Sequence, residues 1–153
     1  MQSIKNKMKK ILSILSLSLL FISCGEKSST VEPKLGANND KDNYIAVYDF
    51  HNEHRCVTCL AIEKATKEVL NDTFKKNLDD GTIVFELYNC EAPENRKLAE
   101  EYFAFGTTLA ITVFKDGEKE IDDVTNWAFE TVKGDNYKKE LIEKLNIALK
   151  KLK

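Results

Sequence analysis

Two cysteines separated by two residues are the part of this chain best suited to chemistry. Cys56 and Cys59 follow an apolar run, residues 44–50, after a short polar stretch, and a long helical pattern begins at the pair. A Cys-x-x-Cys in the order strand, loop and helix is typical of a thiol–disulfide redox motif. A helix N-terminus favours a thiolate, and thiol pKa values in such motifs fall to roughly 3.5–7.5. We therefore predict that Cys56 is the attacking thiol and that Cys59, one turn on, is the resolving thiol.

Polar residues near the pair could assist this chemistry. Arg55 directly precedes Cys56, and its positive charge would stabilise a thiolate; the alternative is a solvated charge of little energetic value. His51 and His54 bracket the loop before the pair. As imidazolium either would also stabilise the thiolate, as neutral imidazole either could bind a metal, and a capping or packing role is the alternative for both.

The remaining cysteine of the folded region leaves a second function open. Cys90 follows the second apolar run and is expected at the same sheet edge as the pair. Three thiolates and one imidazole form a valid zinc set, so Cys56, Cys59, Cys90 and His51 predict, as an alternative, a zinc- or copper-binding module. Cys90 could instead be a third redox partner or a small buried hydrophobic residue. A third hypothesis is a binding domain in which Cys56–Cys59 is a fixed disulfide, whereas the redox interpretation needs no cofactor.

The apolar pattern around these residues predicts an α/β domain. The predicted strands cover residues 44–50, 82–88, 109–114 and 119–124. The predicted helices run from Cys59 towards Phe74 with a short second helix to Leu78, from Pro93 to Gly106 with Leu98, Ala99, Tyr102 and Phe103 buried, over residues 126–132 with Trp127 packed inside, and over residues 137–152. The order β-α-β-α-β-β-α predicts a mixed four-stranded sheet with helices on both faces. A right-handed crossover makes the first two strands parallel and puts Cys56 at their carboxyl edge.

The start of the chain predicts export. Lysines precede an apolar stretch, residues 11–22, that is too short for a comfortable transmembrane helix. The stretch ends in Ser23-Cys24 and resembles a bacterial lipoprotein signal, so we predict a signal peptide over residues 1–23, a lipidated Cys24, a flexible tether over residues 24–43 and a domain over residues 44–153. An ordinary cleaved signal and an uncleaved anchor are the alternatives. Each places the domain in the cell envelope, outside the cytoplasm, and the leading one anchors it to a bacterial membrane by lipid.

Net charge narrows the range of partners. The formal net charge of −2 shows no basic field for nucleic acid, because the Lys-rich segments belong to the signal and the last helix. The redox interpretation predicts protein or small-molecule disulfides and dithiols as substrates. It also predicts a redox protein that donates or accepts electrons.

Residues 44–153 resemble the thioredoxin-like superfamily. The segments that carry the resemblance are residues 47–50, Cys56-Val57-Thr58-Cys59 and the hairpin at residues 113–118 with its Asp116-Gly117 turn. More narrowly, Phe50-His51 followed by Arg55-Cys56-Val57-Thr58-Cys59 is similar to a little-characterised bacterial lipoprotein group with a Phe-His-x3-Arg-Cys-x-Thr-Cys signature. The resemblance implies a thioredoxin-like fold and a membrane-tethered thiol–disulfide oxidoreductase.

The resemblance also implies roles for single residues. Asp49 would be the buried acid that assists proton transfer to Cys59, and the alternative is a strand-end carboxylate that faces solvent. The family's cis-proline, which shapes the substrate groove, would fall at Thr108 or Leu109, and we expect these two residues and His51 to contact substrate. Neither position is proline, which implies weaker recognition of the substrate backbone and a pair more open to metal. Dithiol pairs on this fold span roughly −270 to −120 mV, and the different residues flanking Cys56 prevent a closer value from being transferred.

Overall fold

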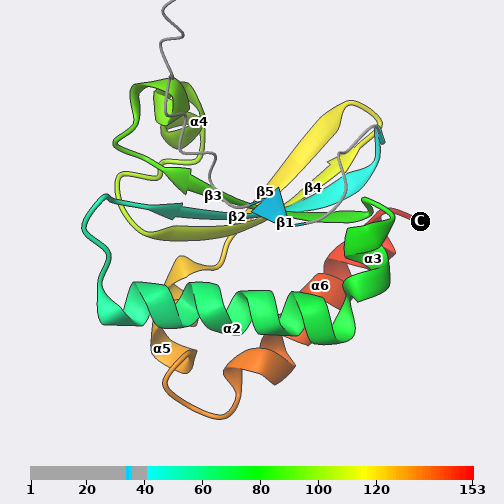
Figure 1. Ribbon diagram of the computed structural model, residues 1–153. Coiled ribbons are helices and arrows are strands. Elements are labelled where there is room, and N and C mark those ends of the chain that lie inside the picture. The colour runs from blue at the N-terminus through cyan, green and yellow to red at the C-terminus, as the bar shows by residue number, and fades with distance from the viewer. Residues whose placement is uncertain (1–33, 36–40) are drawn as a thin grey trace, which may run out of the picture. The chain divides into compact units, whose positions relative to one another are not determined.

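The computed structural model describes Lys34, Leu35 and residues 41–153 (Figure 1). The predicted signal peptide, Cys24 and most of the predicted tether lie outside the described residues. Within that range, two residues form strand β1 (Lys34–Leu35), which pairs antiparallel with Phe85 and Glu86. None of the helices in the described part is long and apolar enough to cross a membrane.

The described residues form one mixed sheet of five strands in the order β1-β3-β2-β4-β5. Its four longer strands are β2 (Tyr44–His51), β3 (Ile83–Asn89), β4 (Thr108–Lys115) and β5 (Glu118–Asp123). β2 pairs parallel with β3, and β4 pairs antiparallel with both β2 and β5. The four predicted strands are therefore confirmed to within a residue or two. β1 adds a fifth strand too short to leave an apolar pattern.

The position of β2 follows from its composition. Ile45, Val47 and Phe50 are completely buried, and only an inner strand has both faces covered in this way. The turn between β4 and β5 follows from Asp116 and Gly117, whose φ angles of 54° and 83° are the positive pair that a two-residue hairpin turn requires. Both features confirm what the sequence predicted.

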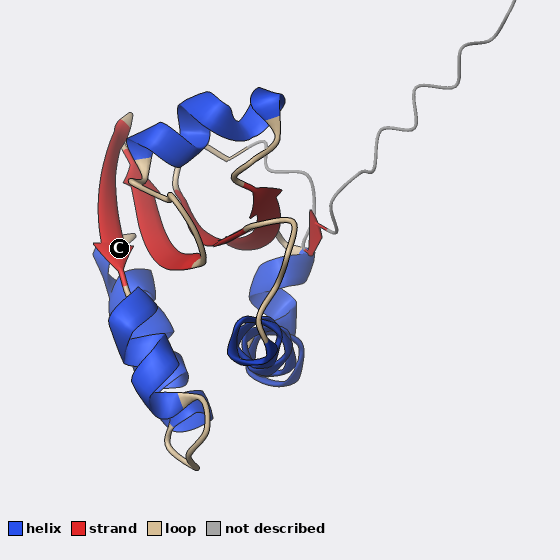
Figure 2. Ribbon diagram, turned by 90° about the vertical axis from the view of Figure 1, so that its left-hand side faces the viewer, coloured by secondary structure: helices blue, strands red, loops and turns tan. Residues whose placement is uncertain are grey.

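Helices cover both faces of the sheet, as predicted. They are α2 (Val57–Thr73), α3 (Lys75–Asp79), the short 3₁₀ helix η1 (Pro93–Asn95), α4 (Arg96–Glu101), α5 (Thr125–Thr131) and α6 (Tyr137–Lys151). Figure 1 shows α2, α3, α5 and α6 on one side of the sheet and α4 on the other, and the turned view in Figure 2 shows the same two layers. The face that carries α2 and α6 has the larger cluster of buried hydrophobic residues.

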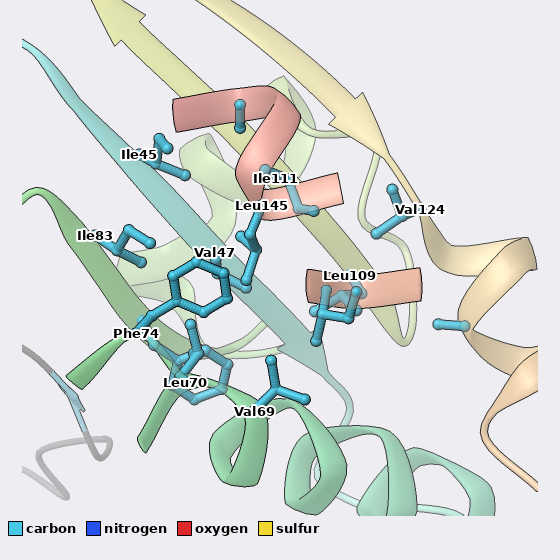
Figure 3. Close-up of a cluster of buried hydrophobic side chains, with 14 of the residues drawn as sticks. Ile45, Val47, Val69, Leu70, Phe74, Ile83, Leu109, Ile111, Val124 and Leu145 are labelled. Carbon is cyan, nitrogen blue, oxygen red and sulfur yellow. The ribbon is translucent and has the colours of Figure 1, made fainter. Parts of the chain in front are cut away.

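The main hydrophobic core lies between the sheet and the α2–α6 layer. Figure 3 shows Val69 and Leu70 of α2 and Leu145 of α6 meeting strand residues such as Val47 and Ile111. A smaller cluster covers the opposite face and is mostly aromatic, formed by the rings of Tyr48, Phe50, Tyr88 and Tyr102. Two cores of unequal size therefore hold β2 in place from both sides.

Trp127 packs as predicted, whereas two predictions for the segment of α4 are wrong: the helix does not run to Gly106, and Phe103 is not buried. The Trp127 ring stacks on Tyr137 with the two ring centroids 4.9 Å apart. Phe103, predicted to be buried, is 81 % exposed, because α4 ends at Glu101 and Phe103 leaves the helix at a φ of 51°. Ala104 turns inward in its place, and its N–H donates to the Ala99 carbonyl oxygen at 2.8 Å.

Candidate functional site: a disulfide at a helix N-terminus

The cysteine pair lies where the sequence predicted, at the start of α2. Cys56 is the N-cap of the helix in an extended backbone conformation, and it forms a disulfide with Cys59 across a Cα–Cα distance of 5.1 Å. The backbone N–H of Cys59 donates to Cys56 Sγ at 3.0 Å. The sulfur thus occupies the place of the oxygen of a usual N-cap side chain. A thiolate formed there faces an N–H group and the positive end of the helix dipole.

The two sulfur-bearing residues differ in their access to solvent. Cys56 is exposed, whereas only 5 % of Cys59 is accessible. The Thr107 hydroxyl donates to Cys59 Sγ at 3.2 Å and supplies a hydrogen bond on the buried side. Because thiol exchange needs access to the attacked sulfur, an incoming thiolate can reach Cys56, and Cys59 is then the leaving group.

The sheet explains why Thr107 meets Cys59. β2 and β3 are parallel, so their carboxyl ends share one edge, and α2 begins after the end of β2. The β2–β4 register pairs Asp49 with Leu109 and Phe50 with Thr108, and Thr107 directly precedes β4. Alternate strand residues share a face at about 3.3 Å per residue. Asp49 therefore pairs with the residue two positions after Thr107, whose hydroxyl contacts Cys59.

Asp49 is a buried acid and does not face solvent. Its exposed fraction is 0 %, and neither of its carboxyl oxygens has a hydrogen-bond partner among the described residues. Burial raises the pKa of Asp49 from 3.8 to about 7, although the Arg55 guanidinium acts to lower it. A carboxyl that titrates near neutral pH can both accept and release a proton, as proton transfer to Cys59 would require.

Arg55 belongs to a network of charges and is not a solvated surface residue. Its side chain is 17 % exposed, and its Nη2 lies 4.0 Å from Asp49 Oδ2. Its Nη1 forms a close ion pair with Glu63 Oε2, while Lys67 pairs with the other oxygen of Glu63. Burial opposes charge on Glu63, but hydrogen bonds from Lys67 and Arg55 hold its pKa below the ordinary value.

The predicted substrate residues lie at the site edge with different exposures. His51 is 9 % exposed, and its Nδ1 donates to the Asn52 carbonyl oxygen at 2.9 Å. Thr108 and Leu109 are 7 % and 1 % exposed, so both side chains point into the protein. Thr107, which directly precedes these two residues, contacts the disulfide through its hydroxyl, and the contact of Thr108 and Leu109 with substrate stays a prediction. Without a proline, no residue in this segment marks the register.

Cys90 is at the predicted edge but on the opposite face of the sheet. It is half-buried against the Tyr48–Phe50 cluster, its Sγ donates to Asn52 Oδ1 at 3.3 Å, and burial raises the pKa of its thiol. Cys59 lies instead on the α2 face. Among the residues that the structure describes, no three His, Cys, Asp or Glu side chains are grouped to hold a metal. The described fold therefore does not bring Cys90 to the cysteine pair.

Several residues of the site region carry no motif and were missed from the sequence. Glu63 reads as one of many charges on the outer face of α2, and Thr107 as a loop residue. Two aromatic residues in the segment before Thr107 are also conspicuous, since Phe103 is 81 % and Phe105 79 % exposed. Val57, directly after Cys56, is 85 % exposed. None of these exposures has a signal in the sequence, where helical spacing instead placed Phe103 in a buried stripe.

The arrangement contains three features that thiol–disulfide exchange would use. It combines an accessible sulfur at a helix N-terminus, a partner sulfur that is buried and hydrogen-bonded, and an acid that titrates near neutral pH on the same face of the sheet. No known protein family, curated protein or solved structure matches this chain significantly. The functional conclusion therefore rests on the geometry.

Proposed function

We propose that this chain is a membrane-tethered, extracytoplasmic thiol–disulfide oxidoreductase with a thioredoxin-like domain. One observation carries the proposal: an exposed cysteine caps a helix and is bonded to a buried cysteine one turn later. A fixed structural disulfide has no need of an exposed sulfur at the positive end of a helix. Exchange chemistry needs both, because the exposed sulfur is attacked and its thiolate must be stabilised.

The arrangement of the strands supports the thioredoxin-like part of the proposal. The order β3-β2-β4-β5, with one parallel and two antiparallel pairings, is compatible with the strand sequence that the resemblance implies. The disulfide follows the central strand, and a tight hairpin joins β4 and β5. The departure is at residues 107–109, where the described chain has no proline and no cis peptide bond.

The reaction balances without a cofactor. In the reduced protein, the Cys56 thiolate attacks a substrate disulfide, a bond forms from Cys56 to one substrate sulfur, and the other substrate sulfur leaves as a thiolate that takes a proton from water. Cys59 then loses its proton to the Asp49 carboxylate and attacks Cys56. The Cys56–Cys59 bond forms, the second substrate thiolate leaves, and two electrons have moved from the protein to the substrate. The reverse sequence oxidises a substrate dithiol.

The proposed location rests on the sequence alone. A lipid on Cys24 and the tether after it would hold the domain in the bacterial cell envelope, where disulfides persist. The substrates proposed are protein or small-molecule disulfides and dithiols. Each cycle leaves the pair oxidised or reduced, so a second redox protein must restore it.

Replacing the resolving cysteine tests the proposal. In Cys59→Ala, a mixed disulfide formed at Cys56 has no internal thiol to release it and should accumulate with glutathione disulfide or with envelope proteins. Non-reducing electrophoresis and mass spectrometry identify the adduct and its site. Cys56→Ala keeps Cys59 and Cys90 and is the matched control, which should trap at least about tenfold less. If the two variants trap equally, or neither traps, the proposal is wrong.

A further inference from the structure

A competition between two carboxylates for one guanidinium distinguishes this site. The Arg55 guanidinium lies within ion-pair distance of both Asp49, on β2, and Glu63, on α2 one turn after Cys59. Arg55 Nη1 is in close contact with Glu63, whereas Nη2 remains 4.0 Å from Asp49. Nη2 and both Asp49 oxygens have no hydrogen-bond partner among the described residues. Within that part of the chain, the completely buried carboxyl therefore has only the long ion pair at 4.0 Å, and the hydrogen-bonded contact of Arg55 is with Glu63.

It is energetically unusual that Arg55 bonds to Glu63 and not to the more deeply buried Asp49. A guanidinium can bind a carboxylate through two parallel hydrogen bonds, and a buried charge is costly unless it is paired. Pairing Arg55 with Asp49 would satisfy the more deeply buried group. The pairing with Glu63 is favoured because Lys67, one turn further along α2, holds the other oxygen of Glu63 and fixes it towards Arg55. Lys67 in turn lies 5.6 Å above the Phe85 ring, which restricts its own movement.

We propose that Glu63 is a positioning residue that keeps the Arg55 guanidinium from pairing directly with Asp49, leaving that carboxyl able to take the Cys59 proton. The proposal rests on the proposed redox function for its purpose, but the positioning is a property of the folded protein. Glu63 touches neither sulfur nor substrate and acts only through Arg55. In the sequence alone, Glu63 looks like any other surface charge of the helix.

The basicity of Asp49 explains why such positioning matters. A carboxylate that pairs directly with arginine has its pKa lowered by about 1–3 units, and it then accepts a proton poorly. Without that hydrogen-bonded pairing, the pKa of Asp49 stays at about 7, because the effect of burial exceeds the attraction of Arg55. His51 on β2 and Lys67 on α2 add weaker attraction, and Glu63 itself adds repulsion.

From α6, the Tyr137 phenol is the group that interacts electrostatically with Asp49. Tyr137 faces Asp49 from α6, and its hydroxyl bonds to the Thr66 hydroxyl at 2.6 Å. Burial and the nearby Asp49 raise the pKa of this phenol, so it remains neutral over the whole working range. Among the charges that act on Asp49, Arg55 therefore exerts the largest attraction and Glu63 the repulsion, and His51 and Lys67 contribute less.

Carboxyl titration by NMR measures the effect directly. With ¹³C-labelled aspartate, the Asp49 carboxyl signal is followed against pH in the oxidised protein and in Glu63→Gln. The substitution removes a repelling charge and frees Arg55, so the Asp49 pKa should fall by about one unit or more. Arg55→Gln should move it in the opposite direction. Glu68→Gln makes the same chemical change on α2, where Glu68 pairs with Lys138, and should leave Asp49 unchanged.

A second variant and a second assay keep the two proposals separable. Glu63→Asp retains the charge but shortens the side chain, so it should lower the Asp49 pKa by less than Glu63→Gln. If both variants leave the Asp49 pKa unchanged or raise it, the positioning role is refuted. The release of glutathione from a Cys56 mixed disulfide is then timed against pH. The midpoint of this profile should move with the Asp49 pKa. A titration shift without any exchange would instead refute the proposed function alone.

Discussion

The stability of the folded protein should depend on pH through Asp49. Its folded-state pKa of about 7 lies above the ordinary 3.8, so between these values the folded protein binds a proton that the unfolded chain does not. Stability then falls as pH rises. The stabilisation that protonated Asp49 gives the folded protein is fully present below about pH 4. It is lost progressively up to about pH 7 and is absent above that. Replacing Asp49 with Asn removes the ionisable group and should remove this dependence.

The size of the effect follows from the shift. A rise from 3.8 to about 7 is about three pKa units, and each unit is worth about 1.4 kcal/mol. The full penalty for ionising Asp49 in the folded protein is therefore about 4 kcal/mol. No discount for solvent applies, because the side chain is completely buried. Asp49→Asn should be close to wild type in stability at pH 4 and up to about 4 kcal/mol more stable at pH 8.5.

Urea unfolding at a series of pH values, with the disulfide kept oxidised, measures this difference. The difference in unfolding free energy between Asp49→Asn and wild type should grow by about 1.4 kcal/mol per pH unit from about pH 4 to 7 and then level off. Asp135→Asn changes an exposed aspartate and should show no such trend. If the unfolding free energies of Asp49→Asn and wild type differ by the same amount at pH 4.5 and pH 8.5, the pKa of Asp49 is not raised in the folded protein.

Three other predictions concern the core and the thiols. Leu145→Ala should lower the unfolding free energy by about 2–5 kcal/mol in urea denaturation, since Leu145 is completely buried between α6 and the sheet (Figure 3). Thr107→Val removes the hydroxyl that donates to Cys59 Sγ and should slow glutathione release from a Cys56 mixed disulfide about tenfold. In the reduced protein at pH 7, iodoacetamide should modify Cys56 at least about tenfold faster than Cys90, whose thiol pKa is raised by burial, as peptide mapping would show.

Each of these three has a matched control. Ile147→Ala shortens an exposed residue of the same helix and should cost less than about 0.5 kcal/mol. Thr107→Ser keeps the hydroxyl and should retain most of the release rate. Unfolding in urea should bring the alkylation rates of the cysteines together, since the helix terminus and the buried environment are then both lost. Equal alkylation rates of Cys56 and Cys90 in the folded protein would contradict the site geometry. So would a Thr107→Val variant that releases glutathione as fast as wild type.

The patterns that repeat along the chain predicted most of the fold. Continuous apolar residues marked β2 as a buried strand, and Asp116-Gly117 marked the hairpin, because strand burial and turn geometry are local properties. The helix that begins at the cysteine pair was found for the same reason. β1 was missed because two residues have no periodicity. Phe103 was assigned to a buried stripe because helical spacing cannot show where a helix ends.

The partners of the site residues could not be predicted in the same way. Whether Asp49 was buried or solvent-facing, and whether Arg55 was paired, depended on contacts across α2 that no spacing encodes. Glu63 looks identical in sequence to its exposed neighbours, and only its pairing with Arg55 separates it from them. Cys90 was expected at the right edge, but the face of the sheet on which its side chain lies follows from the strand register.

The reduction potential of the Cys56–Cys59 pair tests the central claim most directly. The purified protein is equilibrated with glutathione or dithiothreitol buffers, and the fraction of the pair that is reduced is counted by mass after alkylation. An exposed sulfur at a helix N-terminus should give a midpoint between roughly −270 and −120 mV, the range of exchanging pairs. A midpoint below about −300 mV, typical of structural disulfides, would show that the pair serves only to hold the fold together.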